Sequence, residues 1–460
     1  MTTLIPRDPY SKEELEKLYP RDLKLQLVQV ALSHWELPET QRASGNQHGE
    51  LTDKGRETTF ELGQRLRHLY VDQLGFMPRV KSDTEDMYLR TTPIPRALES
   101  LQQAFWGMYP ASARTQDFPP PVIVARSVSD ETLFPNEGNC RRFRQLSKLF
   151  ADRAALRWND TDEMNYINSL LSKWMPENSP KVAVDSRPRL SGIADTINAT
   201  LAHGPATKLP SEFYDNKIRQ HLNKIAVDEW FSGYSESTEY RKLGIGSLMG
   251  DVVDRMVSTA VEGGWRSETS ASGSSTEQGK AIKFALSGCH DTTLAAILNS
   301  TGSFDGNWPP FTSSIAIELF SKASRNSDAG VILEEFASPP IATKKSGFFS
   351  FLTGSSSSGD IPPPQSETAR TPLTSLPEST RQTLKQYYVR IRYNDSPVRI
   401  PGCAAKLQNH LRGDDTFCTL DAFKEIVDKF TPKNWKGECV QNLDEGLYGK
   451  NDKEKAPAGF

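Results

Sequence analysis

The sequence predicts an α/β fold in which helices cover both faces of a largely parallel sheet, with a helical segment inserted into it. Short apolar and β-branched runs alternate with helical patterns up to about residue 112 and again after residue 281. Between about residues 140 and 259 these strand patterns give way to amphipathic helical stretches. No apolar run approaches the roughly 18 residues that a membrane-spanning helix needs. A soluble globular protein is therefore expected.

The first part of the expected core contains two strand-helix units. Leu23–Leu32 is an apolar-rich run suited to a sheet interior. A helix is predicted from Thr52 to Leu74, with Thr52 as its N-cap and leucines along one face. A short strand over Asp86–Arg90 is followed by a second helix that begins near Pro95.

The part after residue 281 is rich in strand patterns. The four predicted strands are 283–288, 313–320, 330–337 and 386–394. A helix is expected to begin just after Asp291 or Thr292, because apolar residues at helical spacing follow them.

These patterns suggest a division into domains. We expect residues 1–112 and 281–460 to form one discontinuous α/β core, with a mainly helical cap over 113–265. The segments 266–280 and 344–372 are rich in Ser, Gly and Pro, so they are expected to be flexible loops.

Charge and composition limit the partners of the chain. Lys and Arg number 55 and Asp and Glu 58, which leaves no overall field to attract nucleic acid or acidic lipid. The first 20 residues are acidic and lack an apolar stretch of signal-peptide length, so an intracellular, cytoplasmic location is expected. Oligomeric state is not predicted.

The five cysteines form no Cys-x-x-Cys pair, which argues against a zinc ribbon or a thioredoxin-like site. Cys403, Cys418 and Cys439 cluster near the C-terminus, where a disulfide is conceivable in an oxidising compartment. The reduced state is the favoured prediction.

The strongest chemical signal is the pair His290-Asp291. A predicted strand ends at Gly288 and a helix follows, so the pair lies where open α/β sheets bind ligands. A helix N-terminus attracts anions, and such a pair can bind a phosphoryl oxygen and protonate a leaving alkoxide. The alternative is a pair that only caps the helix.

Two further signals follow strands in the same way. Arg90 closes the strand before the Pro95 helix, and a planar guanidinium suits phosphate recognition. The alternative is an ordinary surface arginine at a strand end. His34 comes directly after the first strand.

Together these segments resemble the histidine acid phosphatase branch of the histidine phosphatase superfamily. The resemblance is carried by four stretches: 26–36, 50–70, 88–110 and 287–299. It implies a three-layer α/β/α sandwich of the phosphoglycerate-mutase type, with the helical insertion as the cap. It also implies hydrolysis of a small phosphomonoester through a phosphohistidine, with no metal or organic cofactor.

The resemblance also assigns roles to individual residues. His34 matches the nucleophile, Arg90 a phosphate ligand, His290 a second imidazole donor, and Asp291 the proton donor. Arg96 matches a position that we interpret as structural.

The first motif departs from the family pattern Arg-His-Gly-x-Arg-x-Pro. Ser33 and Leu37 replace the two arginines, and Trp35 replaces the glycine. Losing two charged hydrogen bonds would cost about 3–6 kcal/mol of transition-state binding. The alternative reading is therefore a weakened or inactive phosphatase-fold protein with a binding role. A mutase of the same superfamily is a weaker third reading.

The spacing from His34 to Glu50 is also shorter than in the family. Either a real deletion or an exon-boundary error across residues 33–48 would explain this difference. His48 is a rival nucleophile, but Gln47 stands where an arginine is wanted, so His34 is favoured.

Overall fold

The computed structural model describes residues 10–33, 51–204, 207–266, 280–323, 370–448 and 457–460. Within them the strands form one nine-stranded sheet in the order β3-β2-β4-β1-β5-β6-β9-β8, and β7 pairs with β6. The strands are β1 Leu23–Leu32, β2 Met87–Thr91, β3 Ile123–Ala125, β4 Phe284–Gly288, β5 Ser314–Lys322, β6 Tyr387–Tyr393, β7 Ser396–Val398, β8 His410–Leu411 and β9 Asp414–Thr419. The predicted strand at 330–337 lies outside the described residues.

The sheet is parallel on only one side of β1. Strand β1 pairs in parallel with β4, and β2 pairs in parallel with β4 and β3. Strand β5 runs antiparallel to β1, and β6 runs antiparallel to β5. After the helix Asp291–Ser300 the chain returns to the carboxyl end of β1 before it enters β5. There the Ser33 amide donates a hydrogen bond to the Ser313 carbonyl at 2.9 Å. Because β5 starts where β1 ends, it must run the opposite way, and the expectation of a largely parallel sheet is wrong for this half.

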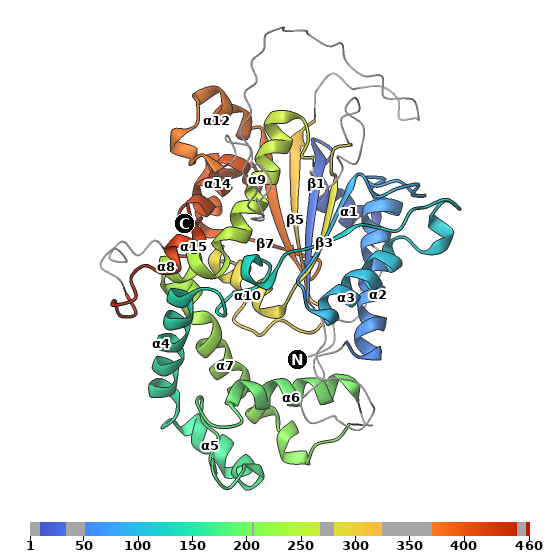
Figure 1. The fold of residues 1–460 in the computed structure, drawn as a ribbon. Helices are drawn as coiled ribbons and strands as arrows, with labels where there is room; N and C mark the ends of the chain where they lie inside the picture. The colour runs from blue at the N-terminus through green and yellow to red at the C-terminus, as the bar shows by residue number, and fades with distance from the viewer. Residues whose placement is uncertain (1–9, 34–50, 205–206, 267–279, 324–369, 449–456) are drawn as a thin grey trace, which may run out of the picture.

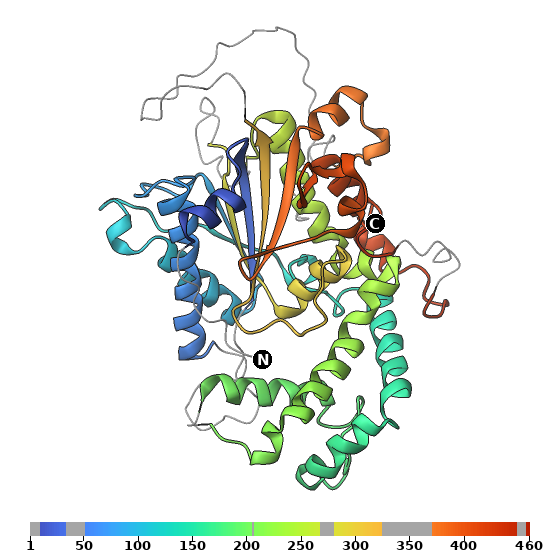
Figure 2. The ribbon, with the colours of Figure 1, turned by 180° about the vertical axis from the view of Figure 1, so that it is seen from behind.

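Helices cover both faces of the sheet, which confirms the predicted α/β/α sandwich (Figures 1 and 2). One face carries α1 Lys12–Leu18, α2 Asp53–Arg67 and α3 Pro95–Met108. The other face carries α9 Ser247–Glu262, α10 Asp291–Ser300, α12 Glu378–Leu384 and α14 Leu420–Asp428. Side chains along β1 alternate between the two apolar clusters, with Leu27 in one and Val28 in the other.

The helix predicted from Thr52 is confirmed. The Thr52 hydroxyl accepts a hydrogen bond from the Gly55 amide at 2.9 Å, and α2 continues as a π-helical segment over His68–Gln73. Helices α2 and α3 approach closely because glycines face each other where they pack. A Cβ on Gly63 would lie 2.0 Å from the Ala104 carbonyl oxygen.

The cap helices lie at one end of the sheet (Figure 1). They are α4 Arg141–Trp158, α5 Asp162–Leu171, α6 Leu190–His203, α7 Asn216–Glu236 and α8 Thr238–Arg241. Helices α5, α6 and α7 share an apolar cluster of their own. The cap range 113–265 stays a prediction, but β3 pairs with the core sheet and α9 packs on it. These contacts favour narrower boundaries for the cap.

Two disulfides join distant parts of the chain. Cys140 bonds Cys439, with Cα atoms 4.7 Å apart, and Cys403 bonds Cys418, with Cα atoms 5.3 Å apart. The prediction of reduced cysteines is therefore wrong for these four. The pairing of Cys140 was not foreseen because 299 positions separate it from its partner, and only the fold brings them together. Cys289 is buried and belongs to neither disulfide.

None of the helices among the described residues is both long enough and apolar enough to cross a membrane.

Candidate active site

The candidate site lies where three neighbouring strands end at the same edge of the sheet. Leu32 of β1 and Thr91 of β2 are both in register with Gly288, the last residue of β4. Ser33 follows β1 and is buried, and its hydroxyl donates to the Ser313 carbonyl at 3.3 Å. Parallel strands thus bring the segments after residues 32, 91 and 288 together, as the sequence predicts.

His290 is the N-cap of α10 and is buried. Its side chain accepts a hydrogen bond from the Thr293 amide, and its Nε2 lies 3.2 Å from the Thr92 hydroxyl. Which of the two groups donates in the contact between Nε2 and Thr92 depends on the tautomer of the ring. The Phe134 ring packs edge-on against the imidazole, with centroids 5.7 Å apart. These contacts fix the position of the ring.

Asp291 begins α10, and its carboxylate is held by two donors. Oδ1 accepts from the Thr292 amide at 2.7 Å, and Oδ2 accepts from the Trp308 indole at 2.6 Å. The residue lines a cavity of about 500 Å³ between the cap and the core. An oriented carboxyl on a cavity wall is suited to exchange a proton with a bound molecule.

The cavity is bounded by α6 and α7 on the cap side. On the core side it is bounded by Asp291, the loop 305–311 and the turn at Tyr393 and Asn394. Its volume falls in the usual range for sites that bind small molecules, roughly 300–1,000 Å³.

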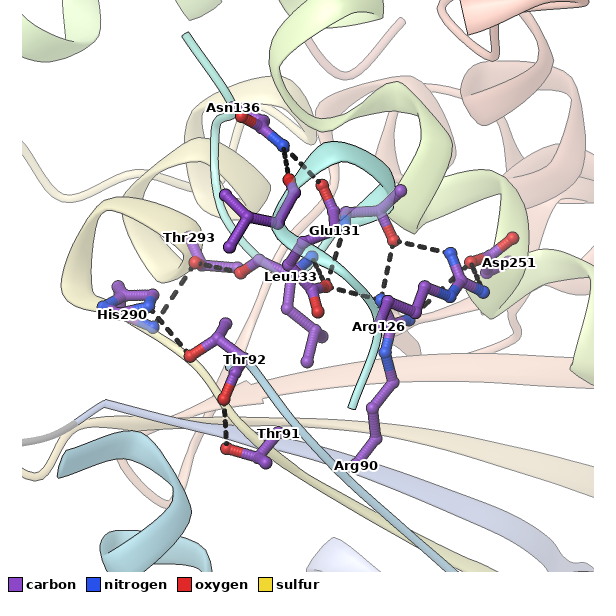
Figure 3. A network of polar contacts seen from close by, with 12 residues as sticks. Arg90, Thr91, Thr92, Arg126, Glu131, Leu133, Asn136, Asp251, His290 and Thr293 are labelled. Atoms are coloured by element: carbon purple, nitrogen blue, oxygen red, sulfur yellow. Dashed lines mark hydrogen bonds and ion pairs between the residues drawn. The ribbon is translucent and has the colours of Figure 1, made fainter. Parts of the chain in front are cut away.

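Arg90 is fully buried at the end of β2 and points into the polar network of Figure 3. Its Nη2 donates to Glu131 Oε1 at 2.6 Å and to the Thr132 hydroxyl at 3.0 Å. Glu131 is also fully buried, and the same oxygen accepts from the Thr132 and Leu133 amides at 2.7 and 2.6 Å. The arginine therefore fixes the loop that precedes α4.

This loop in turn supports the histidine. The Leu133 carbonyl accepts a hydrogen bond from the Thr293 hydroxyl at 2.5 Å, and Thr293 bonds the backbone of His290 (Figure 3). Arg90 and His290 are thus connected through a chain of contacts that passes through Glu131 and Leu133.

A second carboxylate lies near Arg90, on α9. Asp251 Oδ2 is 3.8 Å from Arg90 Nη1 and 3.3 Å from Arg126 Nη2. Burial raises the pKa of the Asp251 carboxyl, but Arg126, Arg370, Arg255 and Arg90 outweigh this effect, so its pKa lies below the ordinary value. Asp251 is therefore a permanent counter-ion for these guanidinium groups.

The structure brings some of the sequence-predicted residues together but not all of them. His290 and Asp291 are adjacent at the start of α10, and Asp291 faces the cavity. Arg90 is the last residue but one of the neighbouring strand β2, but it is not among the residues that line the cavity. Its role as a phosphate ligand stays a prediction, and phosphate would have to replace or join its carboxylate partners. His34 and the rival His48 lie outside the described residues.

Several residues of this site were not singled out from the sequence. Thr92, Glu131, Thr293 and Trp308 hold the His-Asp pair or its neighbours, and they come from four separate segments. The sequence did contain a local signal for Thr92, because it is the first residue after strand β2. His290 has a similar position, two residues after the end of strand β4. Glu131 and Trp308 had no such signal, because their contacts depend on tertiary folding.

Cys289 lies directly before His290 and is buried. Burial raises the pKa of Cys289 to about 12, so its thiol stays protonated at neutral pH. Within the described ranges, no group of three or more His, Cys, Asp or Glu side chains is placed to hold a metal ion.

An α/β/α core with a helical cap and a His-Asp pair at a strand end are the features that the resemblance to the histidine acid phosphatases implies. The model of the histidine phosphatase superfamily (branch 2) matches residues 12–333. The chain therefore belongs to this superfamily, and its assignment as a phosphatase enzyme is confirmed at the level of the family.

Relatives agree with this membership. A protein named as a probable acid phosphatase of Schizosaccharomyces pombe is 37% identical over 392 residues, covering 85% of this chain and 76% of that protein. Lysophosphatidic acid phosphatase type 6 of Homo sapiens is 25% identical, covering 61% of this chain and 59% of that relative. Among solved structures, the Hafnia alvei phytase in complex with tartrate matches with a TM-score of 0.56 at 12% identity, covering 91% of this chain and 99% of the phytase. That likeness shows the fold alone.

Proposed function

We propose that the protein hydrolyses phosphomonoesters through a phosphohistidine intermediate on His34. The observation that carries this proposal is the Asp291 carboxyl on the cavity wall, next to the oriented imidazole of His290. Ser33 supports it, because it anchors the end of β1 at the same edge of the sheet as Gly288.

In the proposed reaction a ring nitrogen of His34 attacks phosphorus, and the bond from phosphorus to the ester oxygen breaks. The protonated Asp291 donates its proton to the leaving alkoxide, and the imidazole of His290 donates a hydrogen bond to a phosphoryl oxygen. Water then attacks the phosphohistidine, Asp291 takes up its proton, and inorganic phosphate leaves with restoration of His34.

A non-catalytic, anion-binding protein is the second candidate. It is favoured by Ser33, which stands where the family has an arginine and which donates its hydroxyl to the Ser313 carbonyl. A neutral serine cannot replace the charge that an arginine brings to a phosphate.

The cellular location also belongs to this proposal. The cytoplasmic location expected from the N-terminal sequence stays a prediction, and two disulfides argue against it, because such bonds persist in oxidising compartments.

The test measures hydrolysis of p-nitrophenyl phosphate and of an alkyl monophosphate. Asp291→Asn should reduce kcat on the alkyl ester by roughly 10²–10⁴-fold, the usual contribution of a general acid. Its effect on the aryl ester should be smaller, because nitrophenolate leaves without a proton. His68→Ala is the matched control, since His68 is half-exposed on the π-helical segment and does not line the cavity.

The intermediate is tested by quenching the reaction with a labelled substrate in alkali, because phosphohistidine is labile to acid. Peptide mapping should place the phosphate on His34, whereas phosphate on His48 would replace the assigned nucleophile. A purified parent protein without activity on either ester supports the non-catalytic alternative.

A further inference from the structure

The cavity beside Asp291 has a lining that differs on its two sides. Helix α6 contributes Ser191, Ala194, Asp195, Ile197 and Asn198, and α7 contributes Asn216, Arg219, Gln220, Leu222, Asn223 and Ala226. Seven of these eleven residues are polar, and the polar side chains recur at successive turns of each helix. The core side differs because it carries aromatic rings and prolines (Trp308, Pro309, Pro310, Phe311 and Tyr393) beside the polar residues Asp291, Asp305, Asn307 and Asn394.

We propose that this cavity binds the uncharged, hydroxyl-rich leaving group of a monophosphate ester, such as a sugar or polyol that carries one phosphate. The inference rests on the proposed function and adds the chemical class of the substrate.

The charges around the cavity support an uncharged leaving group. Among the described lining residues, Arg219 is the one cation, whereas Asp195, Asp291 and Asp305 are carboxylates. A leaving group with several phosphates needs several guanidinium or ammonium partners in a confined site. This lining would repel such a group.

The amides support a group with many hydroxyls. Six of the lining residues are Asn or Gln. Three are held by the fold: Asn394 bonds Ser313 and Ser314, and Asn223 bonds Asn307 at 3.3 Å. The side chains of Asn198, Asn216 and Gln220 make no hydrogen bond within the described part of the chain. An amide both donates and accepts, as a hydroxyl does, so these three are matched to a polyol.

The same features argue against a long acyl chain. Such a chain needs a continuous apolar groove, whereas the α6 and α7 faces place polar groups at successive turns. The aromatic rings on the core side offer flat apolar surfaces of limited extent, which suits the C–H faces of a sugar ring.

The test compares four substrates: glucose 6-phosphate, myo-inositol hexakisphosphate, oleoyl lysophosphatidic acid and p-nitrophenyl phosphate. The protein is produced in a bacterial periplasm, where disulfides form and the Asn198-Ala-Thr sequence is not glycosylated. Glucose 6-phosphate should have a kcat/KM at least about tenfold above those of the hexakisphosphate and the lipid. A preference for either of these two would overturn the proposal.

The double variant Asn198→Leu/Gln220→Leu should lower kcat/KM on glucose 6-phosphate about tenfold more than on p-nitrophenyl phosphate, through loss of two hydrogen bonds. Asn165→Leu, an exposed position on α5 outside the cavity, is the matched control and should change neither value. Equal losses on both substrates would also overturn the proposal.

A parent that hydrolyses none of the four substrates would refute the proposed function separately. The binding of glucose 6-phosphate and of inorganic phosphate is then measured by calorimetry. The double variant should weaken the binding of the sugar phosphate about tenfold more than that of phosphate, and equal effects would refute the assignment of the cavity.

Discussion

Thr92 shows how one hydroxyl can control the His-Asp pair. It lies 3.2 Å from His290 Nε2, and its own backbone is held by Gly288 and Thr91. We expect Thr92→Val to lower kcat about five- to tenfold with little change in KM, because the imidazole of His290 loses the hydrogen bond that orients it. Thr92→Ser should recover most of the activity.

Steady-state kinetics on p-nitrophenyl phosphate check this prediction, and the separate values of kcat and KM distinguish a loss of orientation from a loss of substrate binding. Thr196→Val, on α6 outside the cavity lining, is the control. Equal activity of the valine variant and the parent would show that Thr92 does not position His290.

Arg90 and Glu131 form a buried pair whose role can be separated from catalysis. Both are fully buried and joined at 2.6 Å. Arg90→Gln should lower the free energy of unfolding by about 3–5 kcal/mol, because the Glu131 carboxylate is left without its partner. The double variant Arg90→Gln/Glu131→Gln should recover part of this loss.

Urea unfolding measures the stability of these variants, and p-nitrophenyl phosphate their activity. A stable double variant that lacks activity would support Arg90 as a phosphate ligand. A stable and active double variant would show that Arg90 only positions the loop. Arg96, which is half-buried in the first turn of α3, would then be the next candidate phosphate ligand to substitute.

Glu229 gives the cap a pH-dependent stability. Burial raises the pKa of this carboxyl to about 7 from an ordinary value of 4.5, and Arg189 opposes the shift. A raised pKa means that the folded state holds the proton more tightly than the unfolded state, so this contribution to stability is complete below pH 4.5 and lost as the pH rises to about 7. Glu229→Gln keeps a neutral side chain at every pH.

The variant should therefore match the parent near pH 4 and be more stable by about 1–3 kcal/mol near pH 8. Thermal unfolding across this pH range measures the difference. A difference that does not change with pH would contradict the assigned pKa shift.

At the scale of elements, helices α2 and α3 can pack closely because Gly63 has no side chain. A Cβ at Gly63 would clash with the Ala104 backbone, so Gly63→Ala should destabilise the protein by about 2 kcal/mol despite the better helix propensity of alanine. Gly192→Ala, in α6 with no atom within 4 Å of the added Cβ, should be neutral or stabilising by up to about 1 kcal/mol. Equal unfolding midpoints for the two variants would contradict the close packing.

The elements that the sequence predicts well are those with local signals. Strand β1 has the predicted bounds Leu23–Leu32, and Thr52 caps α2 as expected. The strand-to-helix transition at His290 and Asp291 was also visible, because the strand pattern, Gly288 and the helical spacing are contiguous. The core of the candidate site could be predicted for this reason.

The remainder of the site depends on contacts between distant positions. Glu131 contacts Arg90 across 41 positions, and Asp251 reaches Arg126 across 125. No periodicity marks these partners, since they are chosen by the way the layers pack. The direction of β5 was missed for a similar reason, because the loop after α10 determines it.

At the scale of the whole molecule, the disulfide between Cys140 and Cys439 joins the start of α4 to the C-terminal segment. Arg142 strengthens this junction, since its guanidinium bonds Glu239 and the Glu445 and Gly446 carbonyls. The cap is thereby attached to the core by a covalent bond in addition to its packing.

Removing this bond should destabilise the protein more than removing the other. In the chain-entropy account a loop of 15 residues contributes about 3 kcal/mol, and longer loops contribute more. The Cys403–Cys418 bond closes a separation of 15 positions, and the Cys140–Cys439 bond one of 299. We expect Cys140→Ser/Cys439→Ser to lose about 2–3 kcal/mol more than Cys403→Ser/Cys418→Ser. Urea unfolding without reductant measures both losses, and thiol titration of the denatured parent should find one free cysteine, Cys289. Five free thiols in protein made under oxidising conditions would show that neither bond forms, and the case against a cytoplasmic location would then fail as well.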